Sequence, residues 1–262
     1  MEEAAQLIWK SWNAGQVIPH LPDHLMRNTR AEAYEIQAYY EIFSGKPIFG
    51  WKIAATSNAG QQHIGVDGPI AGRLLRERVF DPDVPLLFGS NRMAVGEAEF
   101  AFRMKDTLIS RVEEYSKSEV MLAVDTLHSA IEIPNSRFKD FSKMGDKQLI
   151  VDNACAHELV IGPAMCDSWR RIDLSKHQVL ISVGEQFPNE GSGSNVLGDP
   201  RIALTWLVNE LSKNGINLCA GEMVTTGTCV TPIKIQPGDE VTADYGSLGL
   251  LKTSFLIDSQ IS

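Results

Sequence analysis

Residues 96–102 read Gly-Glu-Ala-Glu-Phe-Ala-Phe, which sets two acids inside an apolar stretch rich in aromatic side chains. In a β-strand successive side chains alternate between two faces, so Glu97 and Glu99 point the same way and the phenylalanines the other way. A second apolar stretch, residues 129–134, carries a single acid, Glu132. Burying an ionised carboxylate among such residues costs too much free energy unless it is protonated or meets a cation.

Two interpretations of these acids follow from their spacing. Three carboxylate ligands suit Mg²⁺, Mn²⁺ or Ca²⁺ far better than zinc. The plainer interpretation is a pair of amphipathic strands whose acids lie on a solvated face, since Glu-x-Glu is common in half-exposed strands. Taken alone, the spacing favours the plainer interpretation and leaves the metal site open.

The composition narrows the class of protein. A chain of 262 residues with 44% hydrophobic and 22% charged residues is ordinary for a soluble globular protein of one large or two small domains. The net charge of −9 argues against nucleic acid or anionic membranes as partners. The sequence has no transmembrane run, no signal-peptide core and no zinc-type cysteine spacing. We therefore expect a cytoplasmic protein with reduced thiols.

Helix signals are concentrated in the first part of the chain. A helix is expected over residues 4–14, and Thr29 with Glu32 forms a capping-box pattern that opens a second helix to about residue 43. Further on, Asp199 before Pro200 predicts another helix start. The remaining patterns predict short helices over 57–66 and 113–127.

Strand patterns dominate the rest. Besides the two acidic stretches, strands are expected at residues 50–54, 149–154, 179–183, 223–228, 230–235, 241–245 and 250–257. There is no alternation of strand and helix typical of parallel sheets, so the pattern predicts an α+β fold. Lys52 lies in the middle of the strand at 50–54. Its ammonium either reaches the surface on its long stem or points into a pocket, where it could bind an anion or move a proton.

Seven short motifs also occur in a fixed order along the chain: Gly50-Trp51-Lys52-Ile53, Gly72-Arg73-Leu74, Glu97-Ala98-Glu99, Ile131-Glu132-Ile133, Asp152-Asn153-Ala154, Val196-Leu197-Gly198 and Ala220-Gly221-Glu222. Together they resemble the 2-keto-4-pentenoate hydratase and 4-oxalocrotonate decarboxylase branch of the fumarylacetoacetate hydrolase superfamily, over about residues 29–249. The resemblance implies an α+β fold with a rolled, mixed β-sheet core and a small helical N-terminal part. We expect the helical segment at 1–48 and the catalytic core at 49–262, within one continuous domain.

The resemblance further implies a bound Mg²⁺ or Mn²⁺, and it reverses the balance between the two interpretations of the acids in favour of a metal site. The residues that match the family's metal ligands are Glu97, Glu99 and Glu132. We expect two catalytic residues: Lys52, with a pKa lowered by burial, to bind the substrate carboxylate or shuttle a proton, and Asp152 to orient the lysine or a water. Substrate binding is assigned to Arg73, Asn153 and Thr226.

The activity implied is a hydratase of aromatic-compound catabolism, which adds water to a 2-hydroxy-2,4-dienoate and gives a 4-hydroxy-2-oxo acid. The alternatives are a 4-oxalocrotonate-type decarboxylase, an acylpyruvate C–C hydrolase, for which His63 is the one histidine to consider, and an inactive homologue that scaffolds a pathway partner. The expected partners are the 2-hydroxydienoate or 2-oxo acid substrate, further copies in a homo-oligomer and a pathway decarboxylase or aldolase, without nucleic acid or membrane.

Overall fold

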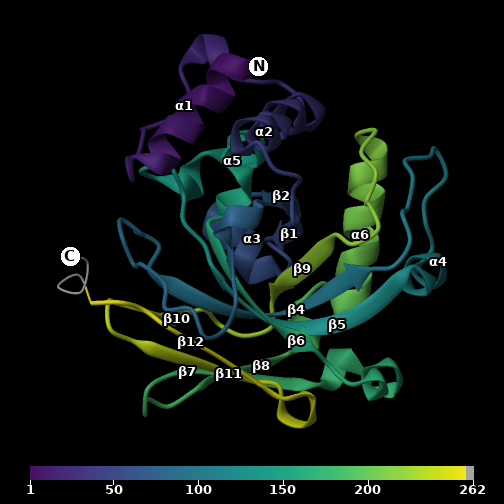
Figure 1. The fold of residues 1–262 in the computed structure, drawn as a ribbon. Helices are drawn as coiled ribbons and strands as arrows, with labels where there is room; N and C mark the ends of the chain where they lie inside the picture. Colours follow the sequence, from purple (N-terminus) through teal and green to yellow (C-terminus); the bar gives the residue numbers. More distant parts are fainter. Residues whose placement is uncertain (258–262) are drawn as a thin grey trace.

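Figure 1 presents a computed structural model of the chain, which describes residues 1–257. A large curled sheet occupies the centre, the N-terminal helices lie on one side of it, and a smaller sheet packs on the other side (Figure 1). The expected α+β fold with a rolled, mixed sheet is confirmed, since β1 runs parallel to β9 while most other pairs are antiparallel. None of the helices described is long and apolar enough to cross a membrane.

The large sheet has the strand order β2 (Ile70–Leu74), β1 (Gly50–Ala54), β9 (Met223–Thr228), β4 (Val95–Met104), β5 (Val124–Ile133), β6 (Glu158–Ala164) and β3 (Val79–Phe80), with β10 (Ile233–Lys234) paired to β4. The smaller sheet has the order β12 (Leu250–Ser254), β11 (Glu240–Asp244), β7 (Gln178–Val183) and β8 (Asn189–Ser192). The helices are α1 (Glu2–Asn13), α2 (Arg30–Ser44), α3 (Asn58–Ile64), α4 (Lys117–Leu122), α5 (Gly145–Val151) and α6 (Pro200–Lys213).

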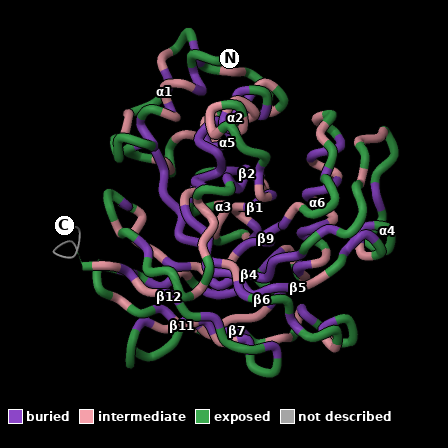
Figure 2. The backbone as a smooth tube through the Cα atoms, viewed as in Figure 1, coloured by how far each residue is buried: buried purple, intermediate pink, exposed green. Residues whose placement is uncertain are grey.

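The two faces of β4 differ in the way that the sequence predicts. Phe100 and Phe102 are fully buried on one face, where their rings contact Tyr245 and Trp169 at centroid distances of 5.3 and 5.8 Å. This face forms part of the main apolar core, and Figure 2 shows how much of the central strands is buried. The acids therefore lie on the opposite face, inside the curl of the sheet.

Strand β2 lies at an edge of the sheet. Side chains from other elements form hydrogen bonds with the backbone groups on its unpaired edge. Tyr34 accepts a hydrogen bond from the Ala71 amide at 3.2 Å, and the Gln37 amide donates to the Ala71 carbonyl at 2.9 Å. Further along, the Asn153 side chain accepts from the Arg73 amide at 2.6 Å and donates to the Arg73 carbonyl at 2.8 Å. These contacts close the strand edge and dock α2 onto the sheet.

The helix starts predicted from capping residues are confirmed. Thr29 and Glu32 form a reciprocal capping box at α2, which ends at the left-handed Gly45. Asp199 caps α6, and Pro200 is its first residue.

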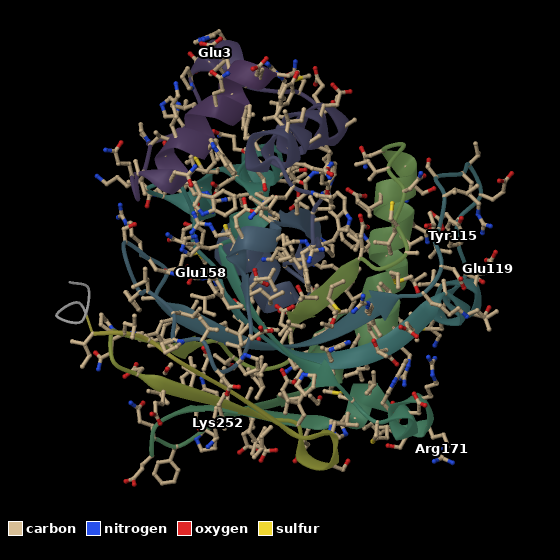
Figure 3. The ribbon with its side chains drawn as sticks, viewed as in Figure 1. Glu3, Tyr115, Glu119, Glu158, Arg171 and Lys252 are labelled. Atoms are coloured by element: carbon tan, nitrogen blue, oxygen red, sulfur yellow. The ribbon has the colours of Figure 1, made fainter. Side chains whose placement is uncertain are left out.

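Side chains fill the space between the N-terminal helices and the large sheet, where Glu158 is labelled (Figure 3).

Three element predictions were wrong. The helix expected over 113–127 is limited to α4, because the β-branched and apolar residues from Val124 onward form the central strand β5. The strand expected over 149–154 is instead the end of α5 and a tight turn. Leu149, Ile150 and Val151 are all buried, and a short apolar run does not distinguish a buried helix from a buried strand. The strand expected over 230–235 is reduced to β10.

Candidate metal centre

Three carboxylates meet inside the curl of the large sheet. Glu97 on β4 and Glu132 on β5 are directly paired across the antiparallel strands, and Glu99 lies two residues further along β4 on the same face. One oxygen from each of the three acids lies within 4.8 Å of the others. Glu99 and Glu132 are each only 1% exposed, whereas Glu97 is half-buried. The strand pairing thus assembles the three predicted ligands at one place.

The hydrogen bonds at this cluster leave carboxylate oxygens free. Glu99 Oε2 accepts a hydrogen bond from the Gly227 amide at 2.8 Å. Glu99 Oε1 and Glu132 Oε2 are buried without a hydrogen-bond partner among the described residues. Anionic oxygens in that position are costly unless a cation meets them, so the donor set fits a bound divalent metal.

The mutual repulsion of the acids changes their protonation. Burial, together with the charge of Glu132, raises the pKa of Glu97 to about 7. Burial and the two neighbouring carboxylates raise the pKa of Glu99 well above its usual range. Like charges held this close cannot all ionise without compensation. A bound cation would supply that compensation and keep all three acids ionised.

Lys52 reaches the same cluster from β1. Its ammonium Nζ lies 2.8 Å from Glu132 Oε1 and donates a hydrogen bond to the Ala154 carbonyl at 3.0 Å, and the side chain is 3% exposed. Burial lowers the pKa of Lys52, but Glu132, Glu97 and Glu99 outweigh it, so its pKa is raised. The lowered pKa expected from burial alone was therefore wrong, because that expectation left out the adjacent carboxylates.

Asp152 is buried beside the cluster but is engaged with other groups. Ser136 Oγ and Arg137 Nε each donate to its carboxylate at 2.6 Å. The same guanidinium donates to the Asn135 and Ala156 carbonyls, both at 2.7 Å, and to the backbone oxygen of Asp152. The hydrogen bonds therefore connect Asp152 to Lys52 only through the backbone of the turn that follows it.

That turn, Asn153–Cys155, has a backbone of uncommon shape. Its three residues have φ values of 55°, 50° and 59°, in the left-handed region that residues other than glycine rarely adopt. Each such residue costs of order 1–3 kcal/mol and persists only where its surroundings determine it. On β2, a Cβ at Gly72 would lie 2.3 Å from the Asn153 carbonyl oxygen, so only glycine allows this close approach. The turn thereby holds the Ala154 carbonyl against Lys52.

The residues assigned to substrate binding do not join the carboxylates. Arg73 is paired with Trp51 across β1 and β2, so its side chain lies on the face opposite to Lys52. Its guanidinium stacks 4.5 Å from the Trp51 ring centre, and burial lowers its pKa to about 10. The Asn153 side chain binds the β2 backbone, as described above. Thr226 donates to the Phe100 carbonyl at 3.0 Å, on the core side of the sheet.

Sequence reasoning missed Gly227. Its amide orients Glu99, and its φ of 102° is unfavourable for other residues. A Cβ at this position would come within 2.2 Å of Thr56 Oγ1. A glycine inside a strand pattern often marks a close backbone approach, which is the signal that could have identified it.

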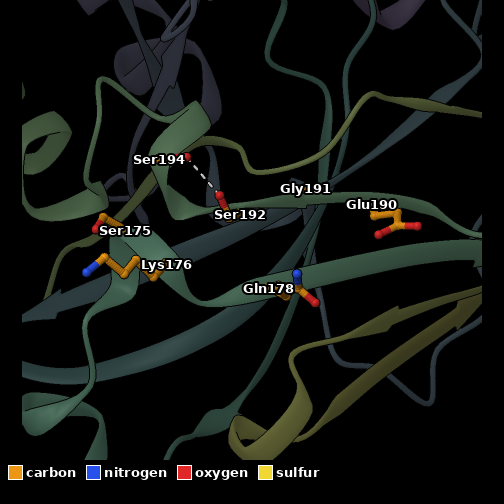
Figure 4. A pocket seen from close by; sticks show the side chains of 7 residues that line it. All are labelled: Ser175, Lys176, Gln178, Glu190, Gly191, Ser192 and Ser194. Atoms are coloured by element: carbon orange, nitrogen blue, oxygen red, sulfur yellow. Dashed lines mark hydrogen bonds between the residues drawn. The ribbon is translucent and has the colours of Figure 1, made fainter.

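Away from the acids, the surface has a hollow of about 780 Å³ at β7 and β8 (Figure 4). It is lined by Ser175, Lys176, Gln178, Glu190, Gly191, Ser192 and Ser194. The hydroxyls of Ser192 and Ser194 form a hydrogen bond of 2.8 Å. None of the lining residues belongs to the carboxylate cluster, so this hollow is separate from the candidate metal centre.

Comparisons with known proteins identify the family of the chain. The family described as fumarylacetoacetate (FAA) hydrolase C-terminal matches residues 58–256. A 2-keto-4-pentenoate hydratase of Paraburkholderia xenovorans is 31% identical over 97% of this chain and 94% of its own length. A 4-oxalocrotonate decarboxylase of Pseudomonas putida is 30% identical over 87% of this chain and 86% of its own length.

A solved structure of a 4-oxalocrotonate decarboxylase from Pseudomonas putida, complexed with magnesium and adipate, superposes with a TM-score of 0.85. It is 25% identical and covers 97% of this chain and 98% of that chain. The same decarboxylase complexed with calcium and acetate gives the same TM-score. Since the family match extends over most of the chain and the curated relatives cover nearly all of it, the chain belongs to the fumarylacetoacetate hydrolase family.

Proposed function

We propose that this chain is a divalent-metal-dependent hydratase that converts 2-hydroxypenta-2,4-dienoate and water into 4-hydroxy-2-oxopentanoate. The observation that carries the proposal is the cluster of Glu97, Glu99 and Glu132, with buried oxygens lacking partners and with Lys52 beside it. The identity of 31% with a named hydratase over nearly the whole chain supports the choice of reaction.

The three acids would hold Mg²⁺ or Mn²⁺, which when bound supplies a Lewis acid for the 2-oxo acid end of the substrate. The Gly227 amide keeps Glu99 in a fixed orientation, with Oε1 left free. In the overall reaction C4 gains a hydroxyl, C3 and C5 each gain a proton, and the 2-hydroxyl loses one. The chain must therefore hold a water and guide protons at the site.

Lys52 is the group suited to the substrate carboxylate. Its raised pKa keeps it an ammonium at neutral pH, and Nζ lies 2.8 Å from a proposed metal ligand. We propose that it binds the substrate carboxylate or donates a proton to the dienolate. Asp152 acts as a positioning residue, because its pairing with Arg137 fixes the turn that presents the Ala154 carbonyl to Lys52.

Three side chains that do not join the carboxylates stabilise the strands of the site: Arg73, Asn153 and Thr226. Asn153 forms hydrogen bonds with the edge of β2, and Arg73 packs on Trp51. Thr226 on β9 donates a hydrogen bond to the backbone of β4. We propose that these contacts keep β1 and β9 in register with β4, which places Lys52 opposite the acids. Homo-oligomeric assembly, a pathway decarboxylase or aldolase partner and a cytoplasmic location stay predictions.

A second candidate is decarboxylation of a 4-oxalocrotonate-type 2-oxo acid. The identity of 30% with a named decarboxylase and the superposition on its solved relative favour it. An acylpyruvate hydrolase is disfavoured, because such enzymes activate water with a histidine–glutamate pair. His63 is exposed on α3, where its ring contacts Phe141 edge to face.

The test is to mix Mg²⁺-loaded protein with freshly generated 2-hydroxypenta-2,4-dienoate and follow its ultraviolet absorbance, with and without EDTA. The proposal predicts metal-dependent loss of absorbance with formation of 4-hydroxy-2-oxopentanoate. In parallel, 4-oxalocrotonate is supplied and carbon dioxide is measured. Carbon dioxide release without hydration of the dienoate would assign the decarboxylase instead.

A further inference from the structure

Two adjacent threonines on β9 are both fully buried but differ in their hydrogen bonds. Thr226 donates its hydroxyl to the Phe100 carbonyl at 3.0 Å. Thr225 Oγ1 has no hydrogen-bond partner among the described residues, although the side chain is 0% exposed. A buried hydroxyl without a partner costs free energy, and a valine of the same shape would avoid that cost. Among the described residues nothing occupies the hydroxyl of Thr225, so it can form a hydrogen bond with a ligand.

The strand register places Thr225 on the face that carries the acids. Its direct neighbours are Lys52 on β1 and Ala101 on β4. Because directly paired residues share a face, Thr225 lies beside the stem of Lys52. Ala101 is two residues beyond Glu99, so the hydroxyl lies about 7 Å along the strands from the metal-ligand level.

Between Thr225 and the acids the directly paired positions on this face carry small side chains, whereas the large side chains of Met223 and Leu74 lie beyond Thr225. Gly72 is paired with Lys52, Ala101 with Thr225, and Ala130 with Glu99. A ligand whose 2-oxo acid end is held at the carboxylates can extend its carbon chain over these residues toward Thr225. In a five-carbon chain, the polar group beyond the oxo acid end is the oxygen at C4.

We propose that Thr225 is a substrate-contacting residue whose hydroxyl binds the oxygen at C4, first as the water that adds and then as the hydroxyl of the product. This inference rests on the proposed hydratase function and deepens it. The hydroxyl both accepts and donates hydrogen bonds, so it can hold the water oxygen in place and remain bonded to it after the C4–O bond forms. No covalent bond to Thr225 is involved.

The test compares two ligands and two variants by calorimetric titration of the Mg²⁺-loaded protein. The ligands are 4-hydroxy-2-oxopentanoate and 2-oxopentanoate, which differ only in the C4 hydroxyl. For Thr225→Val we expect affinity for the hydroxylated acid to fall about tenfold, the loss of one hydrogen bond, with affinity for 2-oxopentanoate unchanged. Thr225→Ser, which keeps the hydroxyl, should retain the preference.

Stability supplies an independent readout. Thr225→Val should melt at the same temperature as the wild type or higher, because it removes an unpartnered hydroxyl. Thr253 on β12 in the smaller sheet is a matched control, since its buried Oγ1 also lacks a partner among the described residues. Thr253→Val should resemble Thr225→Val in stability and leave both ligand affinities unchanged.

The outcomes separate this inference from the function beneath it. If 2-oxopentanoate binds in a metal-dependent way and Thr225→Val keeps the wild-type preference for the hydroxylated acid, the role of Thr225 is refuted and the hydratase remains. A melting temperature for Thr225→Val well below the wild type would also refute it, by revealing a structural partner. If the wild type binds neither acid, the proposed function and the inference both fail.

Discussion

Asp152 and Glu99 are both buried acids, with exposed fractions of 0% and 1%, yet their surroundings differ. Asp152 receives hydrogen bonds from Ser136 and from both the side chain and the amide of Arg137. Glu99 receives one amide hydrogen bond and keeps a buried oxygen without a partner among the described residues. The difference teaches that burial alone does not mark a functional acid. The missing partners do, because a folded chain rarely leaves buried anionic oxygens unpaired.

The largest effect is expected from breaking the paired site. Asp152→Ala leaves the buried guanidinium of Arg137 without its partner, which should destabilise the protein by about 3–5 kcal/mol. Chemical denaturation measures the loss. Exposed Asp140 provides the control, since its ion pair with Lys143 lies in solvent and its side chain caps no helix, so Asp140→Ala should change little. Wild-type stability in Asp152→Ala would contradict the structural role given to this acid.

The next effect concerns Lys52, which contacts both the carboxylate cluster and the turn that follows Asp152. Lys52→Met should lower turnover of the dienoate by roughly 10²–10⁴-fold, because it removes the charge that binds or protonates the substrate. The three acids remain, so Mg²⁺ binding should be kept. Lys176→Met, at the surface, is the matched control. Unchanged kinetics in Lys52→Met would return this residue to a purely structural role.

A smaller effect should appear in the pH dependence of the metal-free protein. Glu97 has a folded-state pKa raised from 4.5 to about 7, so the folded state binds the proton more tightly than the unfolded state. Its contribution to stability is complete below pH 4.5 and is lost as the pH rises to about 7. Denaturation in EDTA across this range should show that decline, and Mg²⁺ should restore stability at pH 7.

The Glu97→Gln variant sharpens this test. It removes one titrating group and should reduce the decline, while Glu99, whose pKa is raised by burial and its neighbouring carboxylates, still contributes to it. Glu158 must be controlled separately. Burial raises the pKa of Glu158 to about 7 as well, although it lies near Arg78 and outside the metal-ligand set. A decline that survives in Glu97→Gln and disappears in Glu158→Gln would show that Glu158, and not the carboxylate cluster, causes the pH effect. That result would contradict our account.

The smallest effect tests the same contrast with uncharged groups. Thr226→Val breaks the hydrogen bond to the Phe100 carbonyl and should cost about 1 kcal/mol of stability. The adjacent Thr225→Val should cost nothing. Equal losses in the two variants, measured by thermal denaturation, would show that the absence of a partner is not a reliable guide to function here.

The sequence predicts the part of the site that depends on strand periodicity. Alternation along β4 sets Glu97 and Glu99 on one face, the apolar stretches around Glu132 and Lys52 single out these two residues, and the resemblance joins all four in one site. Capping residues likewise predict the starts of α2 and α6, because caps act locally. Strand alternation and helix capping require only neighbours in the chain.

The rest depends on contacts that no local pattern encodes. The face on which Arg73 lies follows from its pairing with Trp51, and the role of Asp152 follows from a buried arginine fifteen residues away in the chain. In the left-handed turn after Asp152, Asn153 is of a type that tolerates this conformation, but Ala154 and Cys155 are not, so residue preference indicates only the start of the turn. Thr225 and Thr226 are the same residue type, and only the strand register distinguishes them.

The central claim is that Glu97, Glu99 and Glu132 hold one divalent cation, and Mn²⁺ binding tests it most directly. Calorimetric titration of the wild type should give one Mn²⁺ per chain, while Glu99→Gln should bind at least about 100-fold more weakly and stay folded, because a ligand is lost without an unpaired charge being created. Equal Mn²⁺ affinity in the wild type and Glu99→Gln would contradict the account.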